Sequence, residues 1–204
     1  MMKEFWNDRY NSEEYVYGEV PNEYFHSRFI QFDPGEILFA AEGEGRNAVF
    51  AAKCDWKVTA FDISAEAKKK AEKLAKKHEV ELDYRVGELP DLGFEKGDFD
   101  AVTLVYAHFP VEVRKKYHEL LISYLRRDGL IFFEGFSKKH KIYQDKNPAV
   151  GGPKDEALLF SMEEIKEDFG SLKFLELYET EVDLKEGNGH DGLGAVTRFV
   201  AQKK

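Results

Sequence analysis

A short apolar run that ends in a glycine-bearing stretch constrains this chain more than any other feature. Residues 36–41 follow an Asp-Pro-Gly turn, and the chain continues with Gly43-x-Gly45-x-x-Ala48. The apolar run predicts a buried strand, and glycines at this spacing let backbone N–H groups approach a ligand without interference from a Cβ atom. The pattern therefore predicts a strand, a ligand-binding turn and a helix, in that order.

A second β-prone run, residues 57–61, ends at Asp62, which lies 17 residues after Gly45. A carboxylate at the tip of the second strand of such a unit can accept hydrogen bonds from ribose hydroxyls. Together the two features predict a site for a nucleoside-containing ligand. The alternative is a plain glycine turn, followed by an exposed aspartate that caps the next helix.

Strand and helix patterns alternate along the rest of the chain. Residues 65–78 have an alanine-rich face and a lysine-rich face that we expect to be solvated, and Gly129 is placed to end a helix over 111–127. These patterns predict an α/β fold: a doubly wound, Rossmann-like seven-stranded sheet with a terminal antiparallel hairpin strand. Further helices are expected at 47–53 and directly after Ser161, and further strands at 81–86, 99–106, 130–133, 172–184 and 195–201.

The length of 204 residues predicts one domain spanning 1–204, in which residues 1–32 form an aromatic-rich cover and 137–160 an irregular flap. The net charge of −9 opposes attraction to nucleic acids and to anionic membranes. The longest nearly apolar run, 101–110, is much shorter than a membrane span requires. A single cysteine, Cys54, and the lack of a signal-peptide pattern favour a cytoplasmic location.

The glycine loop alone fits two ligands, a nicotinamide dinucleotide or S-adenosylmethionine. A dinucleotide fold commonly has six parallel strands, whereas five strands and a hairpin are expected here. Glu42 and Glu44 within the loop would repel a pyrophosphate, but would tolerate or attract a sulfonium and an ammonium group. These points favour the cationic cofactor, and an NAD(P)-dependent oxidoreductase is the alternative.

Four segments in succession carry a resemblance to a known family. The chain resembles the class I S-adenosylmethionine-dependent methyltransferases, and its opening resembles a bacterial subgroup related to tellurite-resistance and thiopurine methyltransferases. Phe39 and Ala41 depart from the family pattern, in which an acid and a glycine usually stand at the matching positions. The four segments are 42–50, 58–64, 99–102 and 125–130, and the opening motifs are 5–10, 15–18 and 21–22.

The resemblance implies a set of cofactor-binding residues. Asp62 would hold the ribose hydroxyls, Ile63 would lie against the adenine, and Glu88 would accept from the adenine amino group. The aromatic residues of the opening would either cover the cofactor, where their faces can stabilise a sulfonium, or simply cover the core. The full implied set is Trp6, Tyr10, Tyr17, Ala41, Gly43, Gly45, Asn47, Asp62, Ile63, Glu88, Leu89 and Tyr106.

Methyl transfer from a sulfonium is an in-line displacement, which needs positioning and the exclusion of water but no metal. His108, just after the fourth expected strand, is the best-placed base or anion contact, and Tyr106 could contact the methyl group. A structural role is the alternative for both. Substrate contacts are expected from His108, Lys154, His190 and Arg198, and the alternatives for the last three are exposed-loop or ion-pair roles.

These inferences predict a methyltransferase that acts on a small molecule. By the resemblance, the acceptor would be a thiol or a chalcogen oxyanion such as tellurite or selenite. A non-catalytic S-adenosylmethionine-binding protein is a further alternative. We expect no nucleic-acid or membrane partner, and a monomer or a homodimer.

The first prediction concerns Asp62. Replacement by alanine is expected to weaken cofactor binding by about 1–3 kcal/mol, because charge-assisted hydrogen bonds to the ribose would be lost. Calorimetric titration of the wild type and Asp62→Ala with S-adenosylhomocysteine measures the effect. Equal affinities would remove Asp62 from the site.

Overall fold

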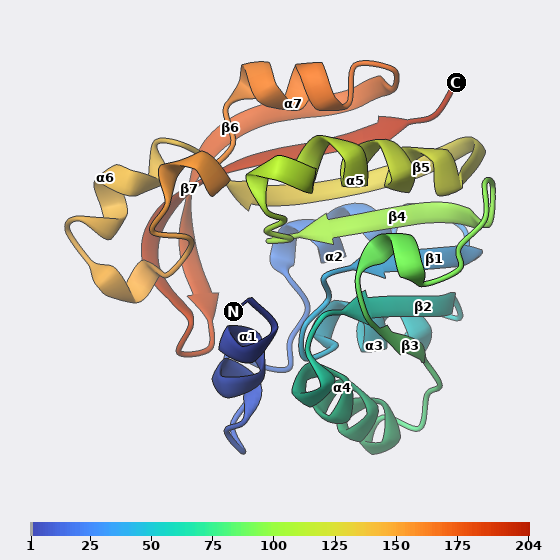
Figure 1. Ribbon diagram of the computed structural model, residues 1–204, viewed down its shortest axis with the longest axis horizontal. Helices are drawn as coiled ribbons and strands as arrows, with labels where there is room; N and C mark the ends of the chain where they lie inside the picture. Colours follow the sequence, from blue (N-terminus) through green and yellow to red (C-terminus); the bar gives the residue numbers. More distant parts are fainter. Residues whose placement is uncertain (1) are drawn as a thin grey trace.

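Seven strands form one mixed sheet in the computed structural model, which describes residues 2–204 (Figure 1). The strand order is β3-β2-β1-β4-β5-β7-β6, with parallel pairing from β3 to β5 and antiparallel pairing of β7 with both of its neighbours. This arrangement confirms the predicted seven-stranded fold with its terminal hairpin. The bounds are β1 Glu36–Ala40, β2 Lys57–Asp62, β3 Asp83–Val86, β4 Phe99–Val105, β5 Leu125–Phe136, β6 Lys173–Glu186 and β7 His190–Gln202.

Helices cover both faces of the sheet, and a further helix lies across the carboxyl ends of the strands (Figure 1). Helices α2, α3 and α4 pack on one face, α5 and α7 pack on the other, and α1 contacts α4 at the strand ends. The bounds are α1 Met2–Tyr10, α2 Glu23–Phe29, α3 Arg46–Lys53, α4 Ala65–Lys77, α5 Val111–Tyr124, α6 His140–Gln144 and α7 Met162–Asp168, with 3₁₀ turns at Leu89–Asp91, Pro148–Val150 and Glu156–Leu158.

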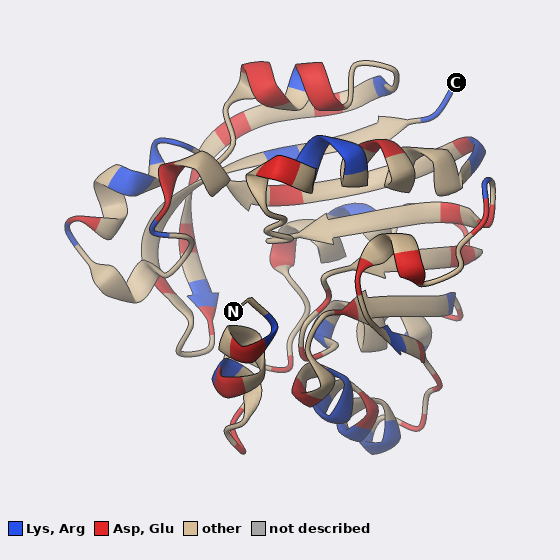
Figure 2. Ribbon diagram, viewed as in Figure 1, with Lys and Arg blue, Asp and Glu red and all other residues tan. Residues whose placement is uncertain are grey.

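Phenylalanine dominates the core on both faces. Nine of the twelve largest fully buried side chains are phenylalanines. Adjacent residues of β5 point to opposite faces, so that Phe132 packs with Phe25 and Phe29 under α2, while Phe133 packs with Phe169 beside α7. Charged side chains lie mainly on the helices and loops around the largely uncharged central strands (Figure 2).

Helix α4 begins where the sequence predicts, and its lysines are mostly solvated. The Ser64 hydroxyl accepts a hydrogen bond from the Ala67 N–H at 3.1 Å and so caps the helix. Lys70 departs from the prediction, because it is buried and its ammonium group lies 2.6 Å from Glu44. This lysine therefore joins the helix to the glycine loop.

Helix α5 is shorter than predicted, ending at Tyr124 rather than near Gly129. The reason is tertiary: the ammonium group of Lys203 donates to the carbonyl groups of Ile122 and Leu125, at 3.0 and 2.6 Å. These carbonyls are among those that a helix end leaves without intrahelical partners. The C-terminal segment thus ends this helix, and β5 begins at Leu125.

The segment 137–160 contains the short helix α6 and two 3₁₀ turns between irregular stretches. After it, Ser161 and Glu164 form the capping box that their spacing predicts, with bonds of 3.1 and 2.8 Å. Within residues 2–204, no helix combines the length and the apolar character that a bilayer crossing requires.

The end of α5 gives a stability prediction. Lys203→Ala is expected to lower the free energy of unfolding by about 1–3 kcal/mol, because carbonyl groups at the helix end lose a charged donor. Lys204→Ala is the matched control, since Lys204 is exposed and should be replaceable without loss. Chemical denaturation of the wild type and the two variants measures both effects. Equal stability of the two variants would contradict the capping role.

Candidate functional site

The loop after β1 has the backbone geometry that its glycines predict. Ala41, Gly43 and Gly45 have φ values of 50°, 65° and 89°, in the left-handed region that favours glycine. Gly45 also packs against Ala71 of α4, where an added Cβ would lie 2.6 Å from the alanine Cβ. Gly45 therefore allows the loop to approach α4, and Ala41 holds a conformation that is uncommon for a residue with a side chain.

Asp62 ties the end of β2 to this loop. Its two carboxylate oxygens accept from the N–H groups of Gly43 and Ser64, at 3.0 and 2.9 Å. Burial raises its pKa to about 6, against the opposing effect of these N–H donors. A carboxylate has lone pairs beyond these two bonds, so Asp62 can also accept from ribose hydroxyls.

The two acids of the glycine loop have structural partners. Glu42 accepts from the N–H groups of Asn47 and Ala48 at 3.0 and 2.9 Å, and so caps α3, whose N-cap residue is Gly45. Burial raises the Glu42 pKa to about 7, although these donors and Arg46 oppose the shift. Asn47, from the predicted cofactor set, is buried at this helix start.

Glu44 differs from the expectation that it faces a cationic cofactor. Its carboxylate accepts from the N–H groups of Val16 and Tyr17, at 3.1 and 3.3 Å, and pairs with Lys70. The buried lysine compensates the charge of Glu44. This residue therefore does not favour a cationic cofactor, contrary to the prediction from its place in the loop. Glu44 instead attaches the N-terminal segment to the loop.

The N-terminal aromatic residues lie over the glycine loop and the hairpin turn. Tyr10 is buried with its hydroxyl against Gly43, and Trp6 stacks on it with ring centroids 5.4 Å apart. Tyr17 lies farther along, with its ring 4.6 Å from that of His190. Trp6 and Tyr10 thus lie at the glycine loop, and Tyr17 lies at the hairpin turn.

The residues implied for the adenine follow β2 and β3. Ile63 is half-buried and Leu89 is buried, so both offer apolar surface at the strand ends. Glu88 is exposed, and its carboxylate accepts from the Tyr117 hydroxyl at 2.9 Å. The apolar pair fits the flat face of a base, and Glu88 still has lone pairs to accept from an amino group.

Tyr106 is held at both ends by one residue of β5. Its N–H donates to the Glu134 carbonyl at 2.8 Å, and its hydroxyl donates to the Glu134 carboxylate at 2.6 Å. The Tyr106 backbone has φ 52°. This left-handed turn directs the chain from β4 toward His108.

His108 has a buried nitrogen, Nδ1, for which residues 2–204 provide no hydrogen-bond partner. Burial, together with the nearby His190 and His140, lowers its pKa to about 3. The imidazole is therefore neutral at ordinary pH and can bond to a ligand. Its ring lies parallel to that of Phe136, with centroids 6.1 Å apart.

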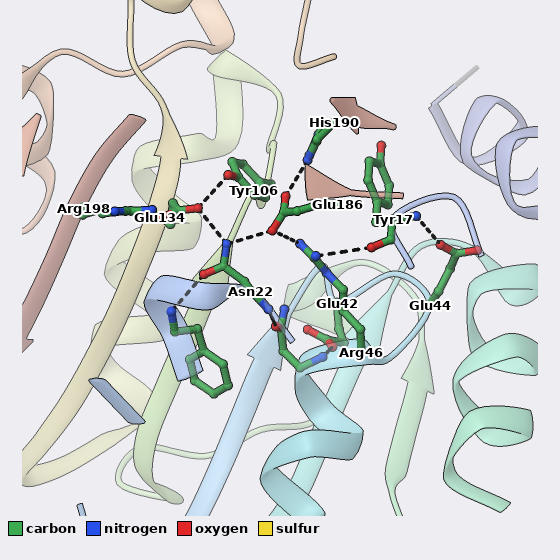
Figure 3. Close-up of polar contacts among 12 residues, drawn as sticks. Tyr17, Asn22, Glu42, Glu44, Arg46, Tyr106, Glu134, Glu186, His190 and Arg198 are labelled. Atoms are coloured by element: carbon green, nitrogen blue, oxygen red, sulfur yellow. Dashed lines mark hydrogen bonds and ion pairs between the residues drawn. The ribbon is translucent and has the colours of Figure 1, made fainter. Parts of the chain in front are cut away.

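Four polar residues for which the sequence predicts no role in the site join the N-terminal segment, α3, β5 and the hairpin (Figure 3). The Asn22 amide donates to Glu134 and to Glu186, at 2.7 and 3.0 Å, and the Arg46 guanidinium lies 2.8 Å from Glu186. An acid inside the apolar run 130–136 was the one sequence signal for Glu134. The contacts that join Asn22, Arg46 and Glu186 to one another link positions too distant along the chain for a local pattern to reveal.

The predicted substrate residues are only partly brought together. Arg198 forms an ion pair with Glu134, its partner in the β5–β7 register, and His190 bonds to Glu186 at 2.8 Å. Lys154 lies exposed in the flap, apart from this buried group. The structure therefore places His190 beside Tyr106, and shows Arg198 in an ion pair.

The hairpin turn 187–189 packs between the cover and the flap. The Gly189 N–H donates to the Val16 carbonyl at 3.0 Å, and an added Cβ would overlap the Tyr17 ring. A Cβ on Gly151 of the flap would overlap the Gly189 carbonyl. The turn thus joins three segments that are distant in sequence.

The part of the chain that contains the glycine loop also matches a known protein family. Residues 37–129, just under half of the chain, match a family model described as a methyltransferase domain. They contain the glycine loop, Asp62 and His108, and the match confirms the predicted enzyme class, an S-adenosylmethionine-dependent methyltransferase, together with its cofactor. No curated protein matches the sequence significantly.

Solved structures confirm the fold. TehB from Haemophilus influenzae is 15% identical with a TM-score of 0.71, over 99% of this chain and 67% of that one. Magnesium protoporphyrin IX methyltransferase from Synechocystis, solved with bound S-adenosylhomocysteine, is 16% identical with a TM-score of 0.71, over 100% and 98%. A protein solved in work on the conversion of a disulfide bond into a thioacetal group during echinomycin biosynthesis is 17% identical with a TM-score of 0.75, over 100% and 93%.

The raised pKa of Asp62 gives a prediction for cofactor binding. Ribose hydroxyls donate to the ionised carboxylate, so affinity for S-adenosylhomocysteine should weaken as pH falls below about 6, approaching tenfold per pH unit. Calorimetric titrations between about pH 5 and 7.5 measure this slope. Asp62→Asn cannot titrate, so the slope from this group should vanish in that variant. A wild-type affinity that is constant across the range would contradict the assignment.

Proposed function

We propose that this methyltransferase acts on a small-molecule acceptor, with a small thiol as the favoured class and a chalcogen oxyanion as the second. The observation that carries this proposal is His108, whose buried Nδ1 is unpartnered among residues 2–204, at the end of β4 and beside aromatic rings. Such a nitrogen is available to a ligand. Its neutral ring suits an uncharged acceptor better than an anion.

The enclosure of this region supports a small acceptor. The Tyr106 ring contacts those of Phe136 and His190, with centroid distances of 4.5 and 4.7 Å. The N-terminal segment and the flap meet at the hairpin turn beside these rings. An acceptor must fit among these segments, and the exclusion of water there favours methyl transfer over side reactions.

The charges favour a thiol over an oxyanion. Arg46 and Arg198, the two arginines of the buried network in Figure 3, are paired with Glu186 and Glu134. A bound oxyanion would require a cation that is not already compensated. Arg9, whose guanidinium donates to the Tyr17 hydroxyl, and Lys154 of the exposed flap could supply one, and they support the second class.

The residues at the strand ends fit S-adenosylmethionine. When bound, the cofactor supplies an electrophilic methyl carbon. The backbone of Gly43 and the Asp62 carboxylate can hold its polar groups, and Ile63 and Leu89 can flank its base. Tyr106 and His108 would then orient the acceptor, and the positioning of the two reactants supplies much of the rate.

We also propose a compartment and an oligomeric state for the protein. A reducing compartment such as the cytoplasm suits a chain whose one cysteine, Cys54, is a free thiol. The chain would act there as a monomer or a homodimer.

Calorimetric titration with S-adenosylhomocysteine, with NADH as the parallel control, tests the cofactor. Micromolar binding of the first ligand alone is the expected result, and binding of NADH instead would overturn the proposal. Formation of S-adenosylhomocysteine is then measured with small thiols, selenite and tellurite. Turnover of thiols is expected to exceed that of the oxyanions, and the reverse order would support the second class. Cofactor binding without turnover of any of these acceptors would contradict both classes.

A further inference from the structure

Glu186 and His190 form a buried acid–imidazole pair where the hairpin turns. Glu186 ends β6 and His190 begins β7, and the two residues are direct partners in the strand register. The distance from Nδ1 of His190 to the Glu186 carboxylate is 2.8 Å, and the two side chains are 5% and 11% exposed. The pair belongs to the polar network in Figure 3.

The surroundings of Glu186 keep it ionised. Burial by itself would raise its pKa, but Arg46 and the bonds from His190 and Asn22 lower it to about 2. An ionised carboxylate only accepts hydrogen bonds, so the hydrogen between the two groups must be on Nδ1 of His190. In the neutral imidazole, the lone pair is then on Nε2, on the edge of the ring away from Glu186.

His190 lies beside Tyr106, which follows β4, and Phe136, which ends β5. Its ring centroid is 4.7 Å from that of Tyr106 and 5.0 Å from that of Phe136. Burial lowers its pKa, although the hydrogen bond from Nδ1 to Glu186 opposes the shift. The ring is therefore neutral and can accept a proton, and Glu186 would stabilise the resulting imidazolium.

The other nearby histidines are less suited to accept a proton. His108 has no acid partner, and its pKa is about 3. Both nitrogens of His140 are engaged: Nδ1 accepts from the Ala195 N–H at 3.2 Å, and Nε2 donates to the Gly151 carbonyl at 3.1 Å. Among these three imidazoles, only that of His190 has a carboxylate partner that orients it.

We propose that His190 is the catalytic base that takes the proton of the acceptor, with Glu186 as the positioning residue that fixes its tautomer. This inference rests on the proposed function, and restricts the acceptor to a group X–H such as a thiol. The acceptor atom X forms a bond to the methyl carbon as the carbon–sulfur bond breaks. The electron pair of that bond goes to sulfur, and the proton from X–H goes to Nε2 of His190.

Several charged and titratable groups face His190, and they set the pH at which it can act. Glu186 favours its protonated form, whereas the nearby cations and the other imidazoles oppose it. The rate with a protonated thiol should therefore fall as pH drops and His190 becomes protonated. The groups are Glu186 of β6, Arg46 of α3, Arg9 of α1, Tyr17 of the N-terminal segment, Tyr106 and His108 after β4, and His140 of α6.

The substitution His190→Asn tests this role, because the asparagine amide can still donate to Glu186 but has no counterpart of Nε2. Initial rates are measured with saturating S-adenosylmethionine and two small thiols, one protonated at the assay pH and one already ionised. The kcat with the protonated thiol is expected to fall by roughly 10²- to 10⁴-fold. The kcat with the ionised thiol should fall by much less, because that acceptor has no proton to lose.

A second acid–imidazole pair provides the matched control. His118 lies 2.8 Å from Asp168, between α5 and α7, and is equally buried. His118→Asn should therefore carry a comparable cost in folding without a difference between the two thiols. Thermal unfolding and the affinity for S-adenosylhomocysteine are measured for both variants, and His190→Asn should retain this affinity within roughly threefold.

The outcomes separate failure of the inference from failure of the proposed function. Equal losses with the two thiols in His190→Asn, or no loss with either, would overturn the role of His190 while the methyltransferase activity stands. A wild type that binds S-adenosylhomocysteine but methylates neither thiol would overturn the acceptor class, and the inference with it. Selective loss with the protonated thiol, absent from His118→Asn, would establish the base.

Discussion

The need to satisfy buried carboxylates shapes the whole carboxyl edge of the sheet. Burying an acid is costly unless hydrogen bonds or a cation compensate it. Asp62 accepts from the N–H groups of Gly43 in the glycine loop and of Ser64 before α4. Glu44 pairs with Lys70 and accepts from backbone N–H groups of the N-terminal segment. Glu134 and Glu186 each form an ion pair with an arginine, and both accept a hydrogen bond from the Asn22 amide. Through these bonds, the acids fix the positions of the cover, the loops and the hairpin relative to one another.

The sequence predicts the glycine loop and the end of β2 well, because these elements lie close together in the chain. A strand, a glycine loop, a helix and a second strand ending in Asp62 lie within about 30 residues, as expected for one nucleoside-binding unit. Each of these elements has its own signal in side-chain size, periodicity or turn chemistry. The predicted doubly wound sheet with its antiparallel end follows from the same signals together with the terminal hairpin.

The polar network around Glu134 and Glu186 is assembled from distant segments, and sequence patterns predict little of it. Asn22 contacts residues 112 and 164 positions away, and no local periodicity reports such a pairing. The early end of α5 has the same origin, since its cap is a lysine from the far end of the chain. Lys70 looked like one of many solvated lysines because its partner lies in another loop. These features depend on tertiary contacts, which override local preference.

The glycines of the β6–β7 turn restrict where the chain can be lengthened. Hairpin tips usually tolerate insertions and tags, because solvent surrounds them. Here the turn backbone at Gly187 and Gly189 lies against the N-terminal segment, and any added side chain would displace it. Gly93 and Gly97, by contrast, have open space where a Cβ would be. A fluorescent label or an affinity tag therefore belongs at Gly93 or Gly97, in the part of the β3–β4 connection that follows the 3₁₀ turn Leu89–Asp91.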